Sequence, residues 1–227
     1  MNTPWQIVSY PRSGNHIIRG LLEAYSGRPT LGCPRKPNDS PIFERSSNQR
    51  LKVIKISDPT PIGYKAHWVK EIRRNNRLYS SPPNLLLITR NPIDAISSHL
   101  SRQSVAKNTI EDKINWFLRG KPSNIKRATD LYLETIMYYR SFKGPKIHLK
   151  FEDLVCESWQ QSHLPDVMSK MTGKSIDPTL NVSDIMLITK ESQQSLSPNM
   201  FEEKQKLSLA VSRHINYKSV LDLLELK

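Results

Sequence analysis

Residues 7–19 read IVSYPRSGNHIIR, and this stretch decides the fold. Its first residues indicate a buried strand, Pro, Ser and Gly in its middle indicate a turn, and the apolar spacing after Asn15 indicates a helix. A turn between a strand and a helix collects backbone N–H groups at the helix N-terminus, where the helix dipole favours an anion. Arg12 adds a permanent positive charge at the same place. The stretch therefore predicts an anion-binding loop.

Candidate strands and helices alternate along the rest of the chain. We expect strands over residues 5–10, 51–57, 62–66, 85–89 and 146–150, and helices over 15–25, 93–100, 109–119 and 124–142. Residues 28–48 are expected to form a long loop. The alternation predicts an α/β fold of three layers, with a central, mostly parallel sheet and helices on both faces. No composition shift marks a boundary, so we expect a single domain over residues 1–227.

Composition restricts the class of protein. A net charge of +13 over 227 residues favours a polyanionic partner such as a nucleic acid, an anionic membrane, an acidic glycan or a nucleotide. Two distant cysteines, Cys33 and Cys156, make a disulfide framework or a zinc site implausible and suit a reducing compartment. The sequence contains neither a signal-peptide pattern nor a run of ~20 apolar residues. We therefore expect a cytoplasmic protein without a membrane partner.

The loop departs from the pattern of magnesium-dependent nucleotide-binding loops. That pattern requires Lys and then Ser or Thr after its second Gly, and the hydroxyl binds the metal. Asn15 and His16 follow Gly14 instead. Two interpretations stay open at this point: a loop that binds an anion without a metal, and a turn with no ligand.

A second basic element follows the strand expected over residues 85–89. Arg90 comes at the strand end, Pro92 suits the first turn of a helix, and Ser98 follows eight residues after Arg90. Along a continuous helix these residues lie ~12 Å apart. Both can reach one anion only if a loop folds Arg90 back over the helix.

Taken together, the segments resemble the sulfotransferases that use 3′-phosphoadenosine-5′-phosphosulfate (PAPS). The 5′-phosphosulfate loop of that family is similar to residues 11–17, and its 3′-phosphate element, Arg-Asn-Pro-x-Asp-x-x-x-Ser, is matched in full by residues 90–98. A Lys-Thr-His element of the family is similar to residues 65–67, and its Tyr-Glu-Asp-Leu element to residues 151–154. The four elements occur in the family's order.

The resemblance implies a sulfotransferase, with PAPS as donor, 3′-phosphoadenosine-5′-phosphate (PAP) as product and no metal. It implies His67 as the base that takes a proton from the acceptor, a role that suits an imidazole titrating near neutral pH. Arg12, and Lys65 unless its role is structural, would stabilise charge on the transferring group. The residues implied in donor binding are Arg12, Ser13, Gly14, Asn15, His16, Ile17, Arg90, Ser98 and Phe151.

The chain departs from the family at several positions. His16 replaces a Thr, Ile17 replaces a Trp that packs on adenine, and Phe151 replaces a Tyr. The late Arg-Lys-Gly loop of the family has no counterpart in residues 190–199, although residues 201–205 resemble the helix that follows it.

Two further groups of residues are expected to be structural. Glu152 and Asp153 are adjacent and are expected to hold loop backbone and basic side chains, because neighbouring side chains seldom point at one substrate. The aromatic residues of the helix expected over 124–142 are expected to pack in the core; they are Tyr132, Tyr138, Tyr139 and Phe142.

Other functions remain open from the sequence. An atypical nucleotide-dependent phosphotransferase would share the sheet and the loop, and a relative that binds the cofactor without turning over would share the whole motif set. A basic nucleic-acid-binding domain fits less well, because only 7% of residues are aromatic and most occur in apolar patterns. The variable segments 28–48, 68–83 and 100–125 are polar and basic, which favours a small polar acceptor of the sulfuryl group. The sequence does not decide between O- and N-sulfation and sets no oligomeric state.

Overall fold

The computed structural model describes most residues up to 174 and a few near the C-terminus. The described residues are 3–32, 41, 56–77, 84–103, 122–174, 205–206, 208–209 and 211–213. The elements within residues 5–172 are β1 (Trp5–Ser9), α1 (Asn15–Ser26), β2 (Thr30–Leu31), β3 (Gly63–Ala66), α2 (Val69–Asn76), β4 (Asn84–Thr89), α3 (Pro92–Gln103), α5 (Pro122–Ser141), β5 (Lys146–Lys150), α6 (Phe151–Leu154), α7 (Glu157–Ser162) and α8 (Leu164–Thr172).

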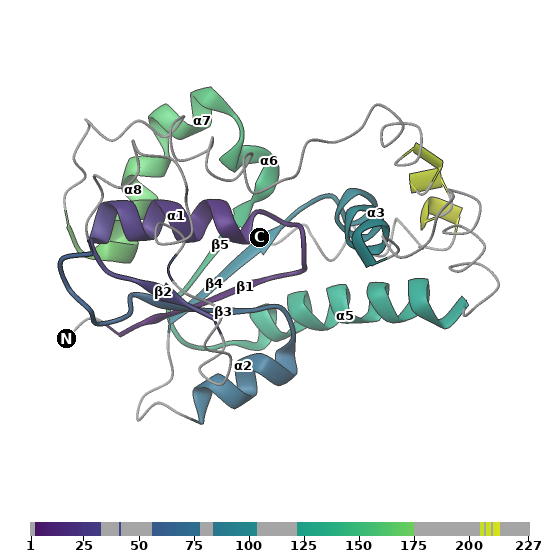
Figure 1. Ribbon diagram of the computed structural model, residues 1–227, viewed down its shortest axis with the longest axis horizontal. Coiled ribbons are helices and arrows are strands. Elements are labelled where there is room, and N and C mark those ends of the chain that lie inside the picture. Colours follow the sequence, from purple (N-terminus) through teal and green to yellow (C-terminus); the bar gives the residue numbers. More distant parts are fainter. Residues whose placement is uncertain are drawn as a thin grey trace.

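The five strands form one parallel sheet in the order β2-β3-β1-β4-β5. Helices α1, α6, α7 and α8 cover one face, and α2 and α5 cover the other (Figure 1). Successive residues of a strand point to opposite faces. Accordingly, Ile7 packs in the core beneath α1 and α8, whereas Val8 packs with Val69 and Ile72 of α2. The predicted three-layer α/β fold is confirmed, and all of the described strand pairs are parallel.

The strands and helices match the sequence expectations in most places. The strand expected over residues 146–150 is β5, and the helix expected over 15–25 is α1. The expectation of a long loop over residues 28–48 was wrong at Thr30 and Leu31. These two residues pair with β3 and form the edge strand β2. The expected helix 109–119 and strand residues 51–55 lie outside the described residues, and Ile56 and Ser57 are in neither a helix nor a strand.

A buried polar network holds α1 against the edge of the sheet. Arg19 is fully buried and donates from Nε to Thr30 Oγ1 (2.8 Å) and from Nη2 to the Thr30 carbonyl (2.9 Å). The Glu23 carboxylate, also buried, accepts from the Thr30 N–H (3.0 Å) and from its hydroxyl. The network explains why β2 forms at Thr30, because both α1 side chains bind that residue.

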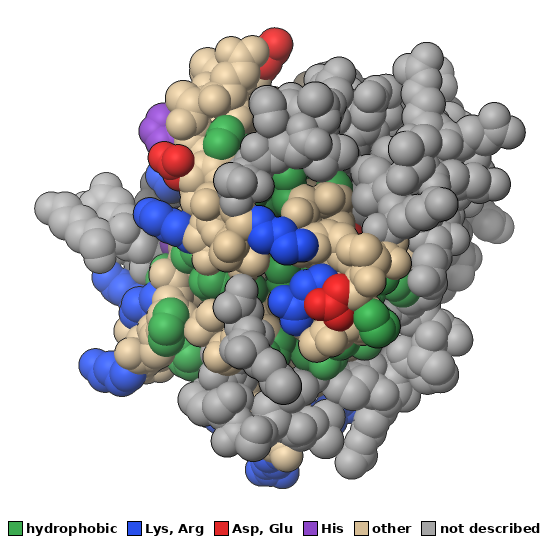
Figure 2. All heavy atoms as spheres, turned by 90° about the vertical axis from the view of Figure 1, so that its left-hand side faces the viewer, with side chains coloured by type: hydrophobic (Ala, Val, Ile, Leu, Met, Phe, Trp, Pro, Cys, Tyr) green, Lys and Arg blue, Asp and Glu red, His purple; other side chains and the backbone are tan. Residues whose placement is uncertain are grey.

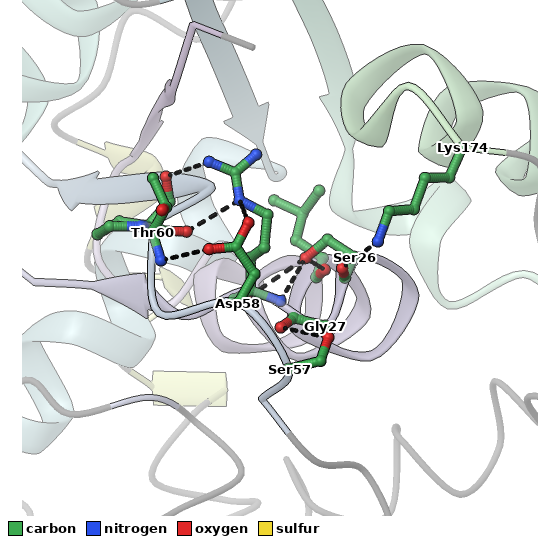
Figure 3. Close-up of polar contacts among 9 residues, drawn as sticks. Ser26, Gly27, Ser57, Asp58, Thr60 and Lys174 are labelled. Carbon is green, nitrogen blue, oxygen red and sulfur yellow. Dashed lines mark hydrogen bonds and ion pairs between the residues drawn. The ribbon is translucent and has the colours of Figure 1, made fainter. Parts of the chain in front are cut away.

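The C-terminal end of α1 is held by a second set of polar contacts (Figure 3). Gly27 ends the helix in the left-handed conformation (φ 67°), and its carbonyl accepts from the N–H groups of Ser57 (2.8 Å) and Asp58 (3.1 Å). Lys174 Nζ, just beyond α8, donates to the Ser26 carbonyl (2.8 Å) and places a positive charge at the negative end of the helix dipole. These contacts fix the far end of the helix whose N-terminus carries the anion loop.

Basic side chains are scattered over one face of the molecule, in keeping with the net charge of +13 (Figure 2). Figure 2 looks onto the side of the molecule that lies at the left of Figure 1, where blue Lys and Arg side chains are separated by neutral polar and apolar surface. The same view contains acidic side chains, one group of which lies against Lys or Arg. This face is at the amino ends of the strands, away from the candidate site described next.

Candidate functional site

The carboxyl ends of four neighbouring strands carry the predicted site residues. Residues 10–14 follow β1, His67 follows β3, Arg90 follows β4 and Phe151 follows β5. Because β3, β1, β4 and β5 are adjacent and parallel, these segments meet at one edge of the sheet. After β1 the chain forms β2 and β3 on one side of it and later forms β4 on the other side. Open α/β sheets bind ligands at such a reversal of strand order.

The loop after β1 has an unusual backbone. Arg12 has a φ of 70° and Gly14 has a φ of 88°, so two nearby residues adopt the left-handed conformation. For Arg12 this conformation is costly, and it persists only where the surroundings enforce it. The helical ladder of α1 begins where the Ile18 N–H donates to the Gly14 carbonyl (3.2 Å). The N–H groups before it point out from the helix end, as an anion site requires.

Ser13 and Gly14 differ in what they offer this loop. The Ser13 N–H donates to the Tyr10 carbonyl (3.2 Å) and so closes the turn, while the Ser13 hydroxyl is buried and has no hydrogen-bond partner within the described part of the chain. At Gly14 a Cβ would lie 2.8 Å from Phe151 Cδ2. A side chain at Gly14 would therefore collide with the ring that follows β5, in addition to straining the backbone.

Arg12 connects the two elements that the resemblance assigns to different phosphates. Its Nε donates to Ser98 Oγ (3.4 Å), and its carbonyl accepts from Arg90 Nη1 (2.9 Å). Arg12 thus contacts both ends of the Arg90–Ser98 element: Ser98 through its side chain and Arg90 through its backbone carbonyl. The spacing required a loop that folds Arg90 back over the helix, whereas the observed contacts run through Arg12 of the loop after β1.

Phe151 and Glu152, which follow β5, contact Arg90 and Asn91. The Arg90 guanidinium lies 4.5 Å from the centre of the Phe151 ring, a cation–π distance. Glu152 Oε1 accepts from the Asn91 N–H (2.9 Å). The expectation that Glu152 holds loop backbone is confirmed. The same role for the Asp153 carboxylate stays a prediction; the Asp153 backbone carbonyl accepts from the Cys156 N–H (3.0 Å).

The backbone and ring of His67 are both held in place. Its N–H donates to Glu71 Oε2 (2.8 Å), a side chain in the first turn of α2. Its Nδ1 lies 2.8 Å from the Ser9 carbonyl. A carbonyl can only accept, so Nδ1 carries the proton and Nε2 of the neutral ring carries the lone pair. His67 is thus oriented as a proton acceptor at Nε2.

The protonation of His67 differs from the sequence expectation. Burial, and after it the positive charge of Lys65, lower the pKa of His67 to about 3, against an opposing contribution from the hydrogen bond to Ser9. The premise that this imidazole titrates near neutral pH was therefore wrong. The ring is neutral at pH 7, so Nε2 is available to accept a proton, although the low pKa makes the ring a weak base.

We expect the His67 ring resonances to show no titration between pH 5 and 8. In Lys65→Met, the pKa of His67 should rise while staying below 6.5, because burial is the larger cause and remains. Proton NMR titration of the histidine Cε1–H signals checks this, with His67→Gln used for assignment. The exposed Lys70→Met is the matched control, and His148 provides an internal reference, since Lys150 and not Lys65 is the cation that lowers its pKa. A wild-type midpoint near 6.5 would contradict the structure.

The low pKa of His67 also has a consequence for stability. A histidine whose pKa is lower in the folded than in the unfolded state binds fewer protons when folded, so its contribution is complete above the unfolded value and is lost as the pH falls below it. The pKa values of His99 and His148 are also lowered, each to about 4 and mainly by burial. All three histidines therefore act in the same direction between pH 6.5 and 4.

The remaining predicted residues lie at different depths. Lys65 is half-buried on β3, and His16 is exposed in the first turn of α1. Asn15 is buried and donates from Nδ2 to Ser9 Oγ (3.1 Å), which ties the helix start to β1. Ile17 is only 5% exposed and packs in the core beneath α1, so it is not brought to the surface of the loop.

Sequence reasoning missed an aromatic group beside the loop. The His99 ring lies 5.3 Å from that of Tyr10 and 6.1 Å from that of Trp68, and the Trp68 ring lies 6.1 Å from that of His67. Arg12 contributes to the lowered pKa of His99, which places the two side chains in electrostatic reach. The available signal was the position of His99 directly after Ser98. Of the expected core aromatics, Tyr132 and Tyr139 are buried, and Tyr138 and Phe142 pack against the core.

The described residues contain neither a metal-binding cluster nor a membrane-spanning helix. Within the described ranges, no group of three or more His, Cys, Asp or Glu side chains is arranged to hold a metal ion. No helix in the same ranges has the length and apolar character needed to span a membrane.

Comparison with solved structures gives matches over most of the chain. A sulfotransferase from Alicyclobacillus acidocaldarius matches with a TM-score of 0.47 and 15% identity, covering 97% of this chain and 96% of that one. Mouse sulfotransferase SULT7A1, solved with PAP, gives 0.45 and 14%, covering 87% and 68%. A retinol dehydratase, solved with retinol and PAP, gives 0.39 and 16%, covering 85% and 65%. No family model and no curated protein sequence matches the chain. In structure as in its motifs, the chain is similar to sulfotransferases.

Proposed function

We propose that the protein transfers a sulfuryl group from PAPS to a hydroxyl or amine of a small polar acceptor. One observation carries the proposal: Arg12 contacts both Ser98 and Arg90, so the loop after β1 and the Arg90–Ser98 element form one cationic site at the carboxyl ends of the strands. His67, with Nε2 as its proton acceptor, lies at the same edge of the sheet. A site of this kind suits a donor that carries phosphate at both ends of a nucleoside.

The residues present fit the donor. Two guanidinium groups supply fixed charge and the fork geometry that suits phosphate oxygens. The N-terminus of α1 supplies outward N–H groups, and the buried Ser13 hydroxyl has no partner among the described residues. The Glu152 carboxylate beside this element accepts from the Asn91 N–H. The donor set is therefore cationic and rich in hydrogen-bond donors.

Each part of the site would have a defined role. The loop 12–16 would hold the 5′-phosphosulfate, while Arg90 and Ser98 would hold the 3′-phosphate, with Phe151 packed beneath Arg90. Bound PAPS supplies an activated sulfonate on a phosphate leaving group. Arg12 and Lys65 would stabilise the negative charge that develops on that group. Ile17 has no role in this proposal because it is buried in the core.

His67 would accept the proton that the acceptor loses as it attacks. Nε2 takes the proton, and the Nδ1–H bond to the Ser9 carbonyl then stabilises the resulting imidazolium. The lowered pKa keeps the ring neutral beforehand, so no proton has to be removed before reaction. The positive charge of Lys65 lowers the pKa of His67, and the negative charge of the bound donor would partly offset that effect.

The 3′-phosphate assignment is tested by calorimetry with PAP and with adenosine 5′-monophosphate. We expect the wild-type protein to prefer PAP, and Arg90→Gln and Ser98→Ala to weaken PAP binding, Arg90→Gln by ~10- to 100-fold, since a hydrogen bond to a charged group contributes ~1.5–3 kcal/mol. Their affinity for the monophosphate should change little. Arg140→Gln is the matched control, because Arg140 is exposed near the end of α5, before β5 begins. Equal wild-type affinity for the two nucleotides would overturn the proposal.

A further inference from the structure

The peptide unit between Arg90 and Asn91 influences the direction of the Arg90 side chain. The carbonyl of this peptide belongs to Arg90 and its N–H belongs to Asn91. Tyr132 Oη donates to the carbonyl (2.6 Å), and Glu152 Oε1 accepts from the N–H (2.9 Å). Since the carbonyl and the N–H of a trans peptide point in opposite directions, the two side chains hold the same plane from its two sides.

The two side chains come from opposite layers of the fold. Tyr132 belongs to α5 and is 2% exposed within the cluster that contains Tyr10, Ala95 and Ile96. Glu152 belongs to α6, and two other residues of that helix, Phe151 and Leu154, pack on the core beneath α1. Figure 1 shows α5 and α6 on the two sides of the sheet, with the end of β4 between them. The peptide is thus fixed relative to both layers.

Fixing this peptide fixes two backbone rotations. The plane sets ψ of Arg90 and φ of Asn91, and with them the direction in which the Arg90 side chain leaves the backbone. Further along that side chain, the Phe151 ring lies against the guanidinium and the Arg12 carbonyl accepts from Nη1. The guanidinium is therefore held in place before any ligand binds, which lowers the entropy lost on binding.

We propose that Tyr132 and Glu152 are positioning residues that orient Arg90 toward the 3′-phosphate of the nucleotide and so determine selectivity for nucleotides that carry it. This inference rests on the proposed function. It also accounts for a carboxylate beside an anion site: Glu152 serves as a hydrogen-bond acceptor for backbone, and its charge is not needed for that contact. The Tyr132 hydroxyl is likewise needed only as a donor, while its ring packs in the core.

The test compares Tyr132→Phe, Glu152→Ala and Glu152→Gln, measuring the affinities for PAP and for adenosine 5′-monophosphate by calorimetry. Tyr132→Phe and Glu152→Ala should lower the PAP-over-monophosphate selectivity by ~5- to 20-fold, the scale of one weakened charge-assisted hydrogen bond, and leave monophosphate affinity within ~2-fold. Glu152→Gln retains an acceptor oxygen and should retain the selectivity. Tyr139→Phe and Asp153→Asn are the matched controls and should bind as wild type.

A second measurement separates positioning from a general effect on folding. In an Arg90→Gln background, Tyr132→Phe and Glu152→Ala should no longer change the selectivity, because the group that they orient is gone. If both variants weaken the two nucleotides equally, or if their effect persists without Arg90, the positioning role is wrong while the proposed function stands. If wild-type protein does not distinguish the two nucleotides, both are wrong. Glu152 is exposed, so Glu152→Ala is expected to fold. This variant alone decides the test if the buried Tyr132→Phe does not fold.

Discussion

His67→Ala is expected to lower the rate of sulfuryl transfer by ~10²- to 10⁴-fold, the usual contribution of a general base. In the wild-type ring the Nδ1–H bond to Ser9 leaves Nε2 as the acceptor, and alanine removes that atom. The measurement is turnover with labelled PAPS and an acceptor found by screening small hydroxyl and amine compounds. Such a screen also identifies the acceptor class, which the variable segments of the chain suggest is polar.

The control for this prediction is donor binding. PAP affinity should stay within ~3-fold of wild type in His67→Ala, because the lost group acts on the acceptor proton. His163→Ala is the matched substitution, since His163 lies in the exposed segment between α7 and α8 and should leave turnover unchanged. Full turnover in His67→Ala would remove His67 from catalysis. A parallel loss of turnover and PAP binding would point to a structural role instead.

Arg19→Met is expected to destabilise the protein by ~3–5 kcal/mol, the scale for removing one partner from a buried charged network. The substitution removes both bonds to Thr30 and leaves the buried Glu23 carboxylate without the positive charge of Arg19 nearby. For a chain of this size that loss corresponds to a fall in Tm of roughly 6–20 °C. Urea denaturation followed by circular dichroism, together with thermal unfolding, measures it.

Two further substitutions sharpen this test. Arg19→Lys keeps a charge but loses the fork that binds the hydroxyl and the carbonyl together, so an intermediate loss is expected. Arg140→Met removes an exposed arginine and should change the free energy of unfolding by less than ~0.5 kcal/mol. A loss below ~1 kcal/mol in Arg19→Met would show that the network is replaceable by apolar packing.

Several strands of the sheet could be predicted from the sequence because each has the local hydrophobic pattern of a strand. Residues 85–89 and 146–150 are short segments with the hydrophobic pattern of strands, and they form β4 and β5. β2 could not be predicted in this way. It has two residues, and it forms because Thr30 binds Arg19 and Glu23 of α1, which no local pattern reveals. The contacts of Arg12 with Arg90 and Ser98 likewise depend on how the loop after β1 packs, which no local pattern reveals.

The sequence by itself determined the chemistry that this protein presents: a strand–turn–helix with Arg12 and Gly14, an Arg-Asn-Pro element that ends in Ser98, and a histidine at residue 67. It could do so because backbone conformation and fixed charge follow from residue type and local spacing. The tertiary structure decided what these groups do to one another. Burial and Lys65 set the low pKa of His67, and Tyr132 and Glu152 from opposite layers hold the peptide that aims Arg90. Desolvation, charge proximity and peptide orientation depend on which segments become neighbours, and only packing decides that.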